Sequence, residues 1–276
     1  METGNKESFI ELIDRSLEGT DPKICHLSIL LRKDGLSFSL IRKDLKKVIL
    51  LGHHPGHDLP ELLRELADQI TEPYGSVSVS LLTDQFFLTP QSLSGDEPMK
   101  VIRQVLKNAN GTKELEGEDL LIGYEDPLEL KETVRSLFGP ETLFAPQAYF
   151  SIGHWLSQSK YKPGFSVYAS WFHGQLEMLA GDGGKLLFYN IFPVIESSDA
   201  GYFILNAFEQ LGINPHKYGI TLGGPSANQA FEDFLKQYIH QVEWLDSFNG
   251  IQFSPEITKP QRRAFAPLFL QFSCVL

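Results

Sequence analysis

The sequence predicts an α/β protein made of two halves with the same organisation. In each half a strand, a tight turn, two more strands, a helix and a further strand follow one another. Gly35 and Gly174 mark the corresponding turns, and the number of residues that separates them also separates Val48 from Leu187. A fixed spacing between like elements indicates an internal duplication.

Length and composition agree with two globular domains. The chain has 276 residues, of which 42% are hydrophobic and 21% charged, enough for two domains that each bury a core. We place the first domain at residues 1–145 and the second at residues 146–276. The net charge of −11 produces a field that repels nucleic acid and anionic membrane surfaces. We therefore expect no nucleic-acid partner.

The start of the chain and its cysteines bear on the compartment. Residues 1–20 contain several acidic side chains and no basic stretch followed by an apolar one, so no signal or transit peptide is predicted. Cys25 and Cys274 are the only cysteines, and we expect packed apolar side chains rather than a disulfide or metal cluster. The apolar end, residues 265–276, is too short to span a bilayer. We expect a cytoplasmic protein with no direct membrane insertion.

The first half is predicted to begin with a β-hairpin. Residues 27–32 and 36–41 are apolar and are joined by a turn that ends at Asp34-Gly35, where the glycine supplies positive φ. A third strand, residues 48–51, completes this group.

The remaining elements of the first half follow from helical and strand periodicity. Asp58 is the expected N-cap of the next helix, with Glu61 at the spacing of a capping box. Residues 76–82 alternate with period two and predict a strand. The others are helices over residues 97–109, 127–138 and 147–159 and a short strand near residues 120–124.

The second half is predicted to repeat the hairpin. Strands over residues 165–171 and 175–180 are joined by a turn at His173-Gly174. The later elements are a strand over 185–192, a helix that begins near Ser197 and ends at Gly212, a strand over 218–222, a helix over 227–242, and a final strand or docked segment at 265–276.

Two glycine-rich segments could contact a phosphate. Residues 181–185 lack the spacing and the Ser or Thr of a phosphate loop, so a hairpin turn is the better interpretation. Gly223 and Gly224, with Ser226, follow a strand and precede a helix, where open backbone amides could approach a phosphate or ribose. The alternative for these glycines is a strand-to-helix turn that needs small residues.

A group of histidines resembles a set of metal ligands. His53, His54, His57 and Asp58 are close in sequence, and imidazole and carboxylate groups bind zinc. Adjacent His53 and His54 would not readily face one ion, and Asp58 is already assigned to a helix cap. We therefore predict a polar loop and no metal site.

Several segments resemble a known superfamily. The order of elements and LGGPSA at residues 222–227 resemble the actin-like ATPase superfamily of sugar kinases, Hsp70-type chaperones and actins. Residues 9–41 and KKVILL at 46–51 are similar to an uncharacterised bacterial "domain of unknown function" family with an actin-like ATPase fold. FFLTP (86–90) and TLFAPQAYF (142–150) are similar to it too. The resemblance implies two ribonuclease-H-like halves that face a cleft.

The resemblance also shows where this chain departs from an enzyme. An active member of the superfamily presents an aspartate from the first strand of each half, because magnesium must be held against the transferring phosphate. Those positions fall near residues 29–31 and 168–170, which contain no carboxylate. Asp34 and Asp182 lie in or near turns instead. Gly223 and Gly224 match the glycines on the adenosine side.

These observations lead to two hypotheses about function. The first is a non-catalytic actin-like protein that acts as a cytoplasmic binding or scaffold module for a protein partner, with aromatic residues such as Phe86 and Phe150 beside turns. The second is an ATP-dependent ATPase or small-molecule kinase whose acids come from Asp84, Glu196 or Asp199. ATP is the possible cofactor, and the first hypothesis requires none.

Overall fold

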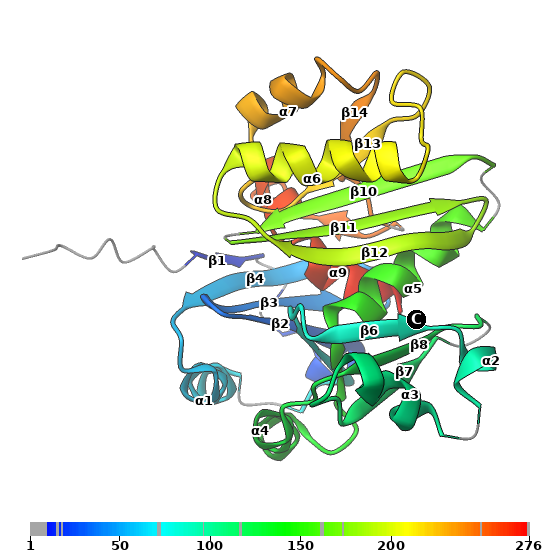
Figure 1. The fold of residues 1–276 in the computed structure, drawn as a ribbon. Helices are drawn as coiled ribbons and strands as arrows, with labels where there is room; N and C mark the ends of the chain where they lie inside the picture. The colour runs from blue at the N-terminus through cyan, green and yellow to red at the C-terminus, as the bar shows by residue number, and fades with distance from the viewer. Residues whose placement is uncertain are drawn as a thin grey trace, which may run out of the picture. The chain divides into compact units, whose positions relative to one another are not determined.

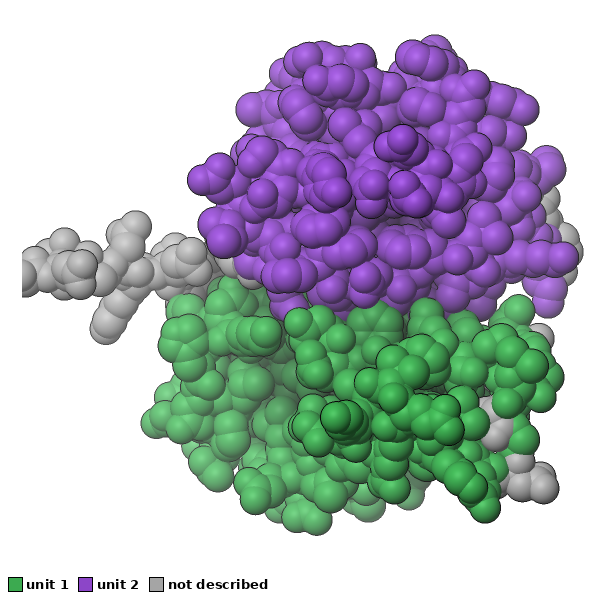
Figure 2. All heavy atoms as spheres, in the orientation of Figure 1, with its two compact units in different colours: residues 1–150, 250–256, 267–276 green, residues 151–249, 257–266 purple. Residues whose placement is uncertain are grey.

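The computed structural model divides the chain into two compact units, coloured separately in Figure 2. Unit 1 comprises residues 1–150, 250–256 and 267–276, and unit 2 comprises residues 151–249 and 257–266. The sequence assigned all of residues 146–276 to the second half, whereas two C-terminal segments belong to unit 1 in the structure. The structure describes residues 10–14, 17, 19–70, 73–95, 97–115, 118–160, 163–172, 174–248 and 250–274.

The main sheet of unit 1 is mixed and has the strand order β1-β4-β3-β2-β5-β9, with β15 also pairing with β4. The predicted hairpin is confirmed, because β2 and β3 are antiparallel and meet at Arg32 and Gly35. Gly35 has a φ of +148°, and a side chain there would collide with the carbonyl oxygen of His54. The strands are β1 (Ile10–Ile13), β2 (Cys25–Arg32), β3 (Gly35–Arg42), β4 (Lys47–Pro55), β5 (Ser76–Leu81), β9 (Leu143–Pro146) and β15 (Gln252–Phe253).

Helices α1 (Leu59–Gln69) and α4 (Leu128–Phe138) pack against each other beside this sheet (Figure 1). The predicted cap of α1 is confirmed, because the Asp58 carboxylate accepts a hydrogen bond from the Glu61 amide at 3.0 Å. Leu62, Leu63 and Leu66 of α1 enter the core of the unit. This apolar face is the source of the helical periodicity in the sequence.

A small three-stranded sheet lies in the connection between β5 and β9, with the order β6-β8-β7. Among the described residues, Ile102, Ala109 and Leu121 form a small core with the partly buried side chains around them. The sequence predicted α3 and β8 but not β6, β7 or α2. The elements are β6 (Phe86–Thr89), α2 (Gln91–Ser94), α3 (Pro98–Val105), β7 (Gly111–Glu114) and β8 (Leu121–Tyr124).

The C-terminal segment is a docked helix, α9 (Ala266–Ser273), so of the two predicted alternatives the docked segment is confirmed and the final strand is not. Gln271 of α9 is fully buried, and its amide nitrogen donates hydrogen bonds to the Ile29 carbonyl at 3.1 Å and to Ser80 Oγ at 2.7 Å. Its amide oxygen accepts a hydrogen bond from Ser78 Oγ at 2.8 Å. These polar contacts and a buried apolar side fix the segment against β2 and β5.

Unit 2 contains a five-stranded sheet with the order β12-β11-β10-β13-β14 (Figure 1). The path β4-β3-β2-β5-β9 of unit 1 has the same sequence of antiparallel and parallel pairs. Each unit also has a register shift at the corresponding place, between Leu40 and Ile41 and between Ala180 and Gly181. The strands are β10 (Phe165–Phe172), β11 (Gln175–Asp182), β12 (Lys185–Pro193), β13 (Ile220–Gly223) and β14 (Val242–Trp244).

The helices of unit 2 are α5 (Gln147–Ser159), α6 (Ser197–Gln210), α7 (Gln229–Leu235) and α8 (Lys259–Ala264), and the first four residues of α5 belong to unit 1. Side chains of α6 and α7 form the core with β10, β11 and β13. The prediction of one helix over residues 227–242 was wrong. Val242–Trp244 is a strand because it pairs in parallel with β13, and this partner is distant in sequence. The predicted turn residue His173 lies outside the described residues.

Candidate functional site

The predicted nucleotide-side turn connects β13 to α7. Gly224 has a φ of +89°, and its amide donates a hydrogen bond to the Arg263 carbonyl at 3.1 Å. The Ser226 amide donates to the Trp171 carbonyl at 3.0 Å. A backbone amide has a single hydrogen to donate. Both amides are therefore already bonded to the protein's own backbone.

The need for glycine at position 224 has a structural cause. A Cβ atom placed there would lie 2.3 Å from the carbonyl oxygen of Trp171 and 2.6 Å from its nitrogen. The backbone of β10 thus occupies the space in which a side chain would project. The alternative that the sequence left open, a turn that requires small residues, accounts for Gly224.

Helix α8 and strand β14 surround this turn with paired side chains. The Arg263 guanidinium binds Asp246 through two hydrogen bonds, of 2.6 and 2.9 Å, and lies 4.2 Å from the centre of the Trp244 ring. The Trp244 indole N–H donates to Glu232 at 2.6 Å, and Glu232 is also paired with Lys236. These side chains bind one another, and the network holds α8 against the turn.

The positions expected to carry the metal-binding acids are buried and uncharged. Ile29–Leu31 lies within β2 and has no more than 1% exposure at any residue. In β10 the positions are Tyr168, Ala169 and Ser170, of which Ser170 is completely buried. Neither strand presents a carboxylate.

Sequence reasoning missed an acid on the neighbouring strand. Glu177 of β11 is directly opposite Ser170, and Ser170 is in register with Gly223 of β13. The row Glu177–Ser170–Gly223 therefore crosses the sheet at the level of the glycine turn. A signal was present in the sequence, since Glu177 interrupts the apolar run of the predicted strand over 175–180.

The Glu177 carboxyl is completely buried. Tyr189 Oη donates a hydrogen bond to Glu177 Oε1 at 2.8 Å, and Oε2 has no hydrogen-bond partner among the described residues. Burial raises the pKa of Glu177 to about 7, against the lowering effect of contacts with Ser151 and Tyr189. A carboxyl without solvent access cannot hold a metal ion against a substrate.

The acids considered as replacements have local structural roles or lie in loops. Glu196 is the N-cap of α6 and forms a reciprocal capping box with Asp199. Asp199 Oδ2 accepts hydrogen bonds from the amides of Ile195 and Glu196, at 3.1 and 3.0 Å. Asp84 lies in a loop and accepts a hydrogen bond from the Gln85 side chain. Asp84 belongs to unit 1, whereas Glu196 and Asp199 belong to unit 2.

The histidines of β4 and the following loop point to different partners. His53 Nδ1 and Ser37 Oγ are 3.0 Å apart, whereas His54 is buried and its pKa is lowered by burial. His57 Nδ1 lies 2.8 Å from the Lys33 carbonyl. Within the ranges that the structure describes, no three His, Cys, Asp or Glu side chains are grouped so as to hold a metal ion.

The glycine-rich segment of residues 181–185 is a hairpin turn between β11 and β12, as predicted. Gly183 and Gly184 have φ values of +54° and +86°, which match a two-residue turn with positive φ at both central positions.

The aromatic residues proposed as a contact surface are less available than expected, because Phe150 is completely buried. Phe86 and Phe87 belong to β6 and are partly buried.

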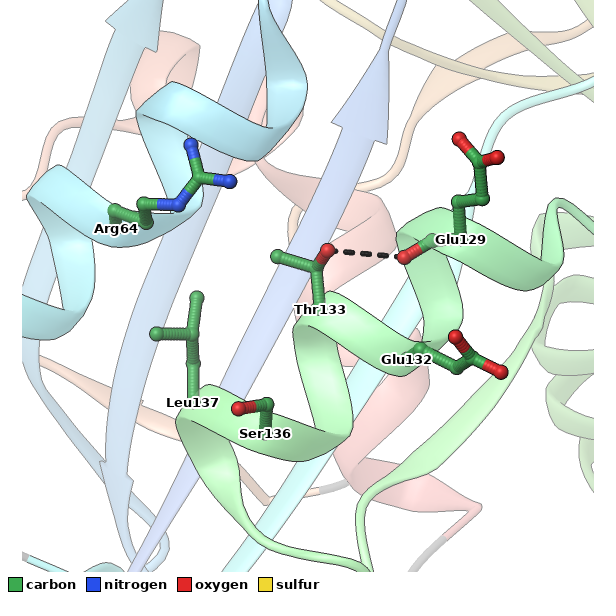
Figure 3. A pocket seen from close by; sticks show the side chains of 6 residues that line it. All are labelled: Arg64, Glu129, Glu132, Thr133, Ser136 and Leu137. Atoms are coloured by element: carbon green, nitrogen blue, oxygen red, sulfur yellow. Dashed lines mark hydrogen bonds between the residues drawn. The ribbon is translucent and has the colours of Figure 1, made fainter.

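A shallow depression on unit 1 lies between α1 and α4 (Figure 3). Thr133 Oγ1 donates to the Glu129 carbonyl at 2.9 Å, so this hydroxyl is used within its own helix. Arg64, Glu129 and Glu132 are exposed, and the two glutamate side chains point away from Arg64. We assign no function to the depression. The lining residues are Arg64, Glu129, Glu132, Thr133, Ser136 and Leu137.

The residues present do not fit a magnesium nucleotide. The amides of Gly224 and Ser226 are bonded to Arg263 and Trp171, and the first strands lack acids. The remaining acid of the row, Glu177, has no exposure.

No helix in the described part of the chain has the length and apolar character needed to cross a bilayer.

Solved structures show the same fold at low sequence identity. A protein from Bacteroides thetaiotaomicron VPI-5482, described as having an actin-like ATPase fold and unknown function, matches with a TM-score of 0.69 and 20% identity. The match covers 85% of this chain and 94% of that protein. A chain of the PilM–PilN type IV pilus biogenesis complex matches with a TM-score of 0.66 and 10% identity, covering 92% of this chain and 100% of that one.

The sequence itself gives the family. None of the proteins with curated functions matches it. Residues 14–242 match the family described as "Protein of unknown function (DUF3822)". The chain therefore belongs to this family, and its fold is the actin-like ATPase fold.

Proposed function

We propose that this protein is a non-catalytic member of the actin-like ATPase fold and acts as a cytoplasmic binding or scaffold module for a protein partner. One observation carries the proposal: the amides of Gly224 and Ser226, which a nucleotide would need, donate to carbonyl oxygens of the same chain. The absence of carboxylates at residues 29–31 and 168–170 supports it, because phosphoryl transfer depends on a metal ion held by acids.

The alternative, an ATP-dependent enzyme with displaced acids, receives less support from the geometry. Glu196 and Asp199 satisfy the amides at the start of α6, and using them for catalysis would remove that cap. The similarity to a protein found in the PilM–PilN complex is compatible with a role in a protein assembly. At 10% identity it gives no information on the partner of this chain.

We infer that the two units arose by duplication of one bacterial module whose catalytic acids are missing from both copies. The shared order of strands and the register shift at corresponding places support this history. A β-bulge is a specific local feature that families retain, so the same bulge in both units is more informative than the strand order alone.

Thermal unfolding with and without millimolar Mg·ATP tests the absence of nucleotide binding. A ligand at about 100 times its dissociation constant adds about 2.7 kcal/mol of stability, which is readily seen as a higher midpoint. We expect no shift for this protein, while an actin-like ATPase that binds ATP, measured in the same buffer, should show one.

A second measurement tests the binding role. The full chain, immobilised through a tag, should recover a stoichiometric protein partner from a native extract, and the purified protein should not hydrolyse ATP. Steady ATP turnover by the purified chain, together with recovery of no partner, would overturn the proposal. A control with Asp199→Asn should show the same lack of turnover as the unmodified chain.

A further inference from the structure

Strand β11 of unit 2 contains a buried acid that has no role in the glycine turn or in a helix cap. Glu177 is completely buried in β11, between Ser170 of β10 and Ile191 of β12 in the register of the sheet. A buried carboxyl of this kind is costly to ionise unless it is paired with a positive charge. The groups around Glu177 therefore decide whether its carboxyl is protonated or ionised.

The groups that face Glu177 are neutral hydroxyls. Tyr189 from β12 donates a hydrogen bond to it at 2.8 Å, and Ser151 from α5 contacts the carboxyl. Burial, together with the nearby Glu177 carboxylate, raises the pKa of the Tyr168 hydroxyl on β10. No ion pair of Glu177 is found in the described part of the chain. An ionised carboxylate would therefore have hydrogen-bond donors but no countercharge.

Helix α5 covers this part of the sheet and is closely fitted to β11. Besides the contact of Ser151 with Glu177, the Trp155 ring lies on Gly181, where an added Cβ would be only 1.8 Å from Trp155 Cη2. Such proximity requires glycine at this position. Helix α5 therefore packs on the part of β11 that contains Glu177.

We propose that Glu177 is a proton-binding site that controls how residues 151–159 of α5 pack on the sheet of unit 2. The neutral carboxyl is compatible with the closed cover. Loss of the proton leaves a negative charge that only water can solvate fully, and water reaches it when this part of α5 opens. Because burial raises the pKa of Glu177 to about 7, the change takes place near neutral pH. The inference does not depend on the proposed function.

His154 has to be removed to isolate this titration. It lies on α5 itself, and burial lowers its pKa from 6.5 to about 4. In the open helix this histidine would regain its ordinary pKa, so its protonation favours opening at low pH and opposes the effect of Glu177. The pH dependence is therefore measured in His154→Gln, which cannot ionise at this position, with and without Glu177.

Hydrogen–deuterium exchange of the full chain tests the proposal directly. In His154→Gln, exchange of the amides in residues 151–159, corrected for the intrinsic effect of pH, should be about 30-fold faster at pH 8.5 than at pH 5.5. Carboxyl carbon NMR of ¹³C-labelled glutamate should show one signal, absent in Glu177→Gln, with a midpoint near 7. A midpoint near the ordinary glutamate value would overturn the proposal.

Variants separate the proton site from a general effect of pH. When Glu177→Gln is added to His154→Gln, the corrected exchange of α5 should no longer depend on pH. Glu232→Gln is the matched control, since Glu232 is also buried in unit 2 but is paired with Lys236 and Trp244. Added in the same way, it should retain the pH dependence of His154→Gln. The same pH dependence after Glu177→Gln is added would refute the assignment.

A milder variant keeps the test open if Glu177→Gln does not fold. Tyr189→Phe removes the hydroxyl that donates to Glu177 Oε1. This hydroxyl favours the charged form of the carboxyl, so its removal should raise the pKa of Glu177. The midpoint of α5 opening should move to higher pH in this variant. An unchanged midpoint, or one moved to lower pH, would contradict the proposal.

Discussion

The two units bury polar groups on one face of each sheet in different ways. In unit 1 the helix α9 places the neutral amide of Gln271 on β2 and β5, where it donates to Ile29 and Ser80 and accepts from Ser78. In unit 2 the helix α5 covers the acid Glu177, one oxygen of which has no partner among the described residues. The first arrangement is satisfied at any pH, whereas the second depends on a proton.

The sheet of unit 1 also contains a buried base. His26 in β2 is completely buried, with its ring nitrogens 2.8 and 3.0 Å from the hydroxyls of Ser76 and Ser78. Burial, and to a lesser extent the charge of Lys43, lowers the pKa of His26 to about 3. The buried histidines of both units, His26 and His154, therefore stay neutral near pH 7, whereas the buried acid Glu177 of unit 2 changes state there. The comparison teaches that a buried base and a buried acid on the same fold respond to pH in opposite directions.

The largest expected effect is a loss of stability of unit 1 in acid. The folded pKa of His26 lies below its unfolded value of 6.5, so its contribution is present above pH 6.5 and is lost as the pH falls toward 3. The full loss is about 5 kcal/mol. Exchange protection of the β2 amides, measured from pH 7 to pH 4, should fall accordingly. His26→Gln, which cannot ionise, should reduce this slope, and an equal slope in both proteins would disprove the assignment.

The next effect concerns the satisfied network of unit 1. Gln271→Leu keeps the side-chain volume similar but leaves Ile29 O, Ser78 and Ser80 without this partner, and should lower the free energy of unfolding by about 3–5 kcal/mol. Urea unfolding followed by circular dichroism measures the change. Gln210→Leu is the control, because Gln210 is exposed at the end of α6, and its effect should stay within about 0.5 kcal/mol. Equal effects of the two substitutions would contradict the role of Gln271.

The third effect is a loss of stability of unit 2 as the pH rises from 4.5 to about 7. The folded pKa of Glu177 is raised from 4.5 to about 7, so its contribution is present below pH 4.5 and is lost as the pH rises through 7. The difference is about 3 kcal/mol. Tryptophan fluorescence reports on unit 2 alone, because Trp155, Trp171 and Trp244 all belong to it. Measured in His154→Gln, which removes the opposing titration of that buried histidine, Glu177→Gln should flatten this dependence, and the idea fails if unfolding seen by fluorescence has the same midpoint at pH 5 and pH 8.

The smallest effect compares corresponding helix caps. The helix after the third strand of each hairpin group is α1 in unit 1, capped by Asp58, and α6 in unit 2, capped by the Glu196–Asp199 box. Asp58→Ala and Asp199→Ala should each cost about 1 kcal/mol in chemical unfolding. Asp58→Asn retains an acceptor and should cost only a few tenths of a kcal/mol. A cost for Asp58→Asn as large as for Asp58→Ala would show that charge, rather than capping, matters at α1.

Local sequence patterns were sufficient for most secondary structure. The two β-hairpins, the cap at Asp58, the glycine turn of residues 181–185 and the helix over 147–159 are confirmed because each depends on neighbours within a few residues. The elements that were missed or assigned wrongly depend on distant partners. Strand β14 exists because β13 offers an edge, and α9 is a helix docked on β2 and β5.

The candidate site shows the same limit. The position of Gly223 and Gly224 after a strand followed from the sequence, but the acceptors of the turn amides did not. Arg263 lies far along the chain from Gly224, and its carbonyl reaches the turn only because α8 packs there. Glu177 likewise became part of the same row as Gly223 only through strand pairing.

The sequence alone therefore determined two similar α/β halves and the lack of acids on their first strands, since periodicity, turn glycines and residue identity are local properties. The tertiary structure decided which backbone amides are still available to a ligand and which acid is shielded from water. Hydrogen-bond saturation and desolvation depend on groups brought together from distant parts of the chain, and no window of sequence contains both partners.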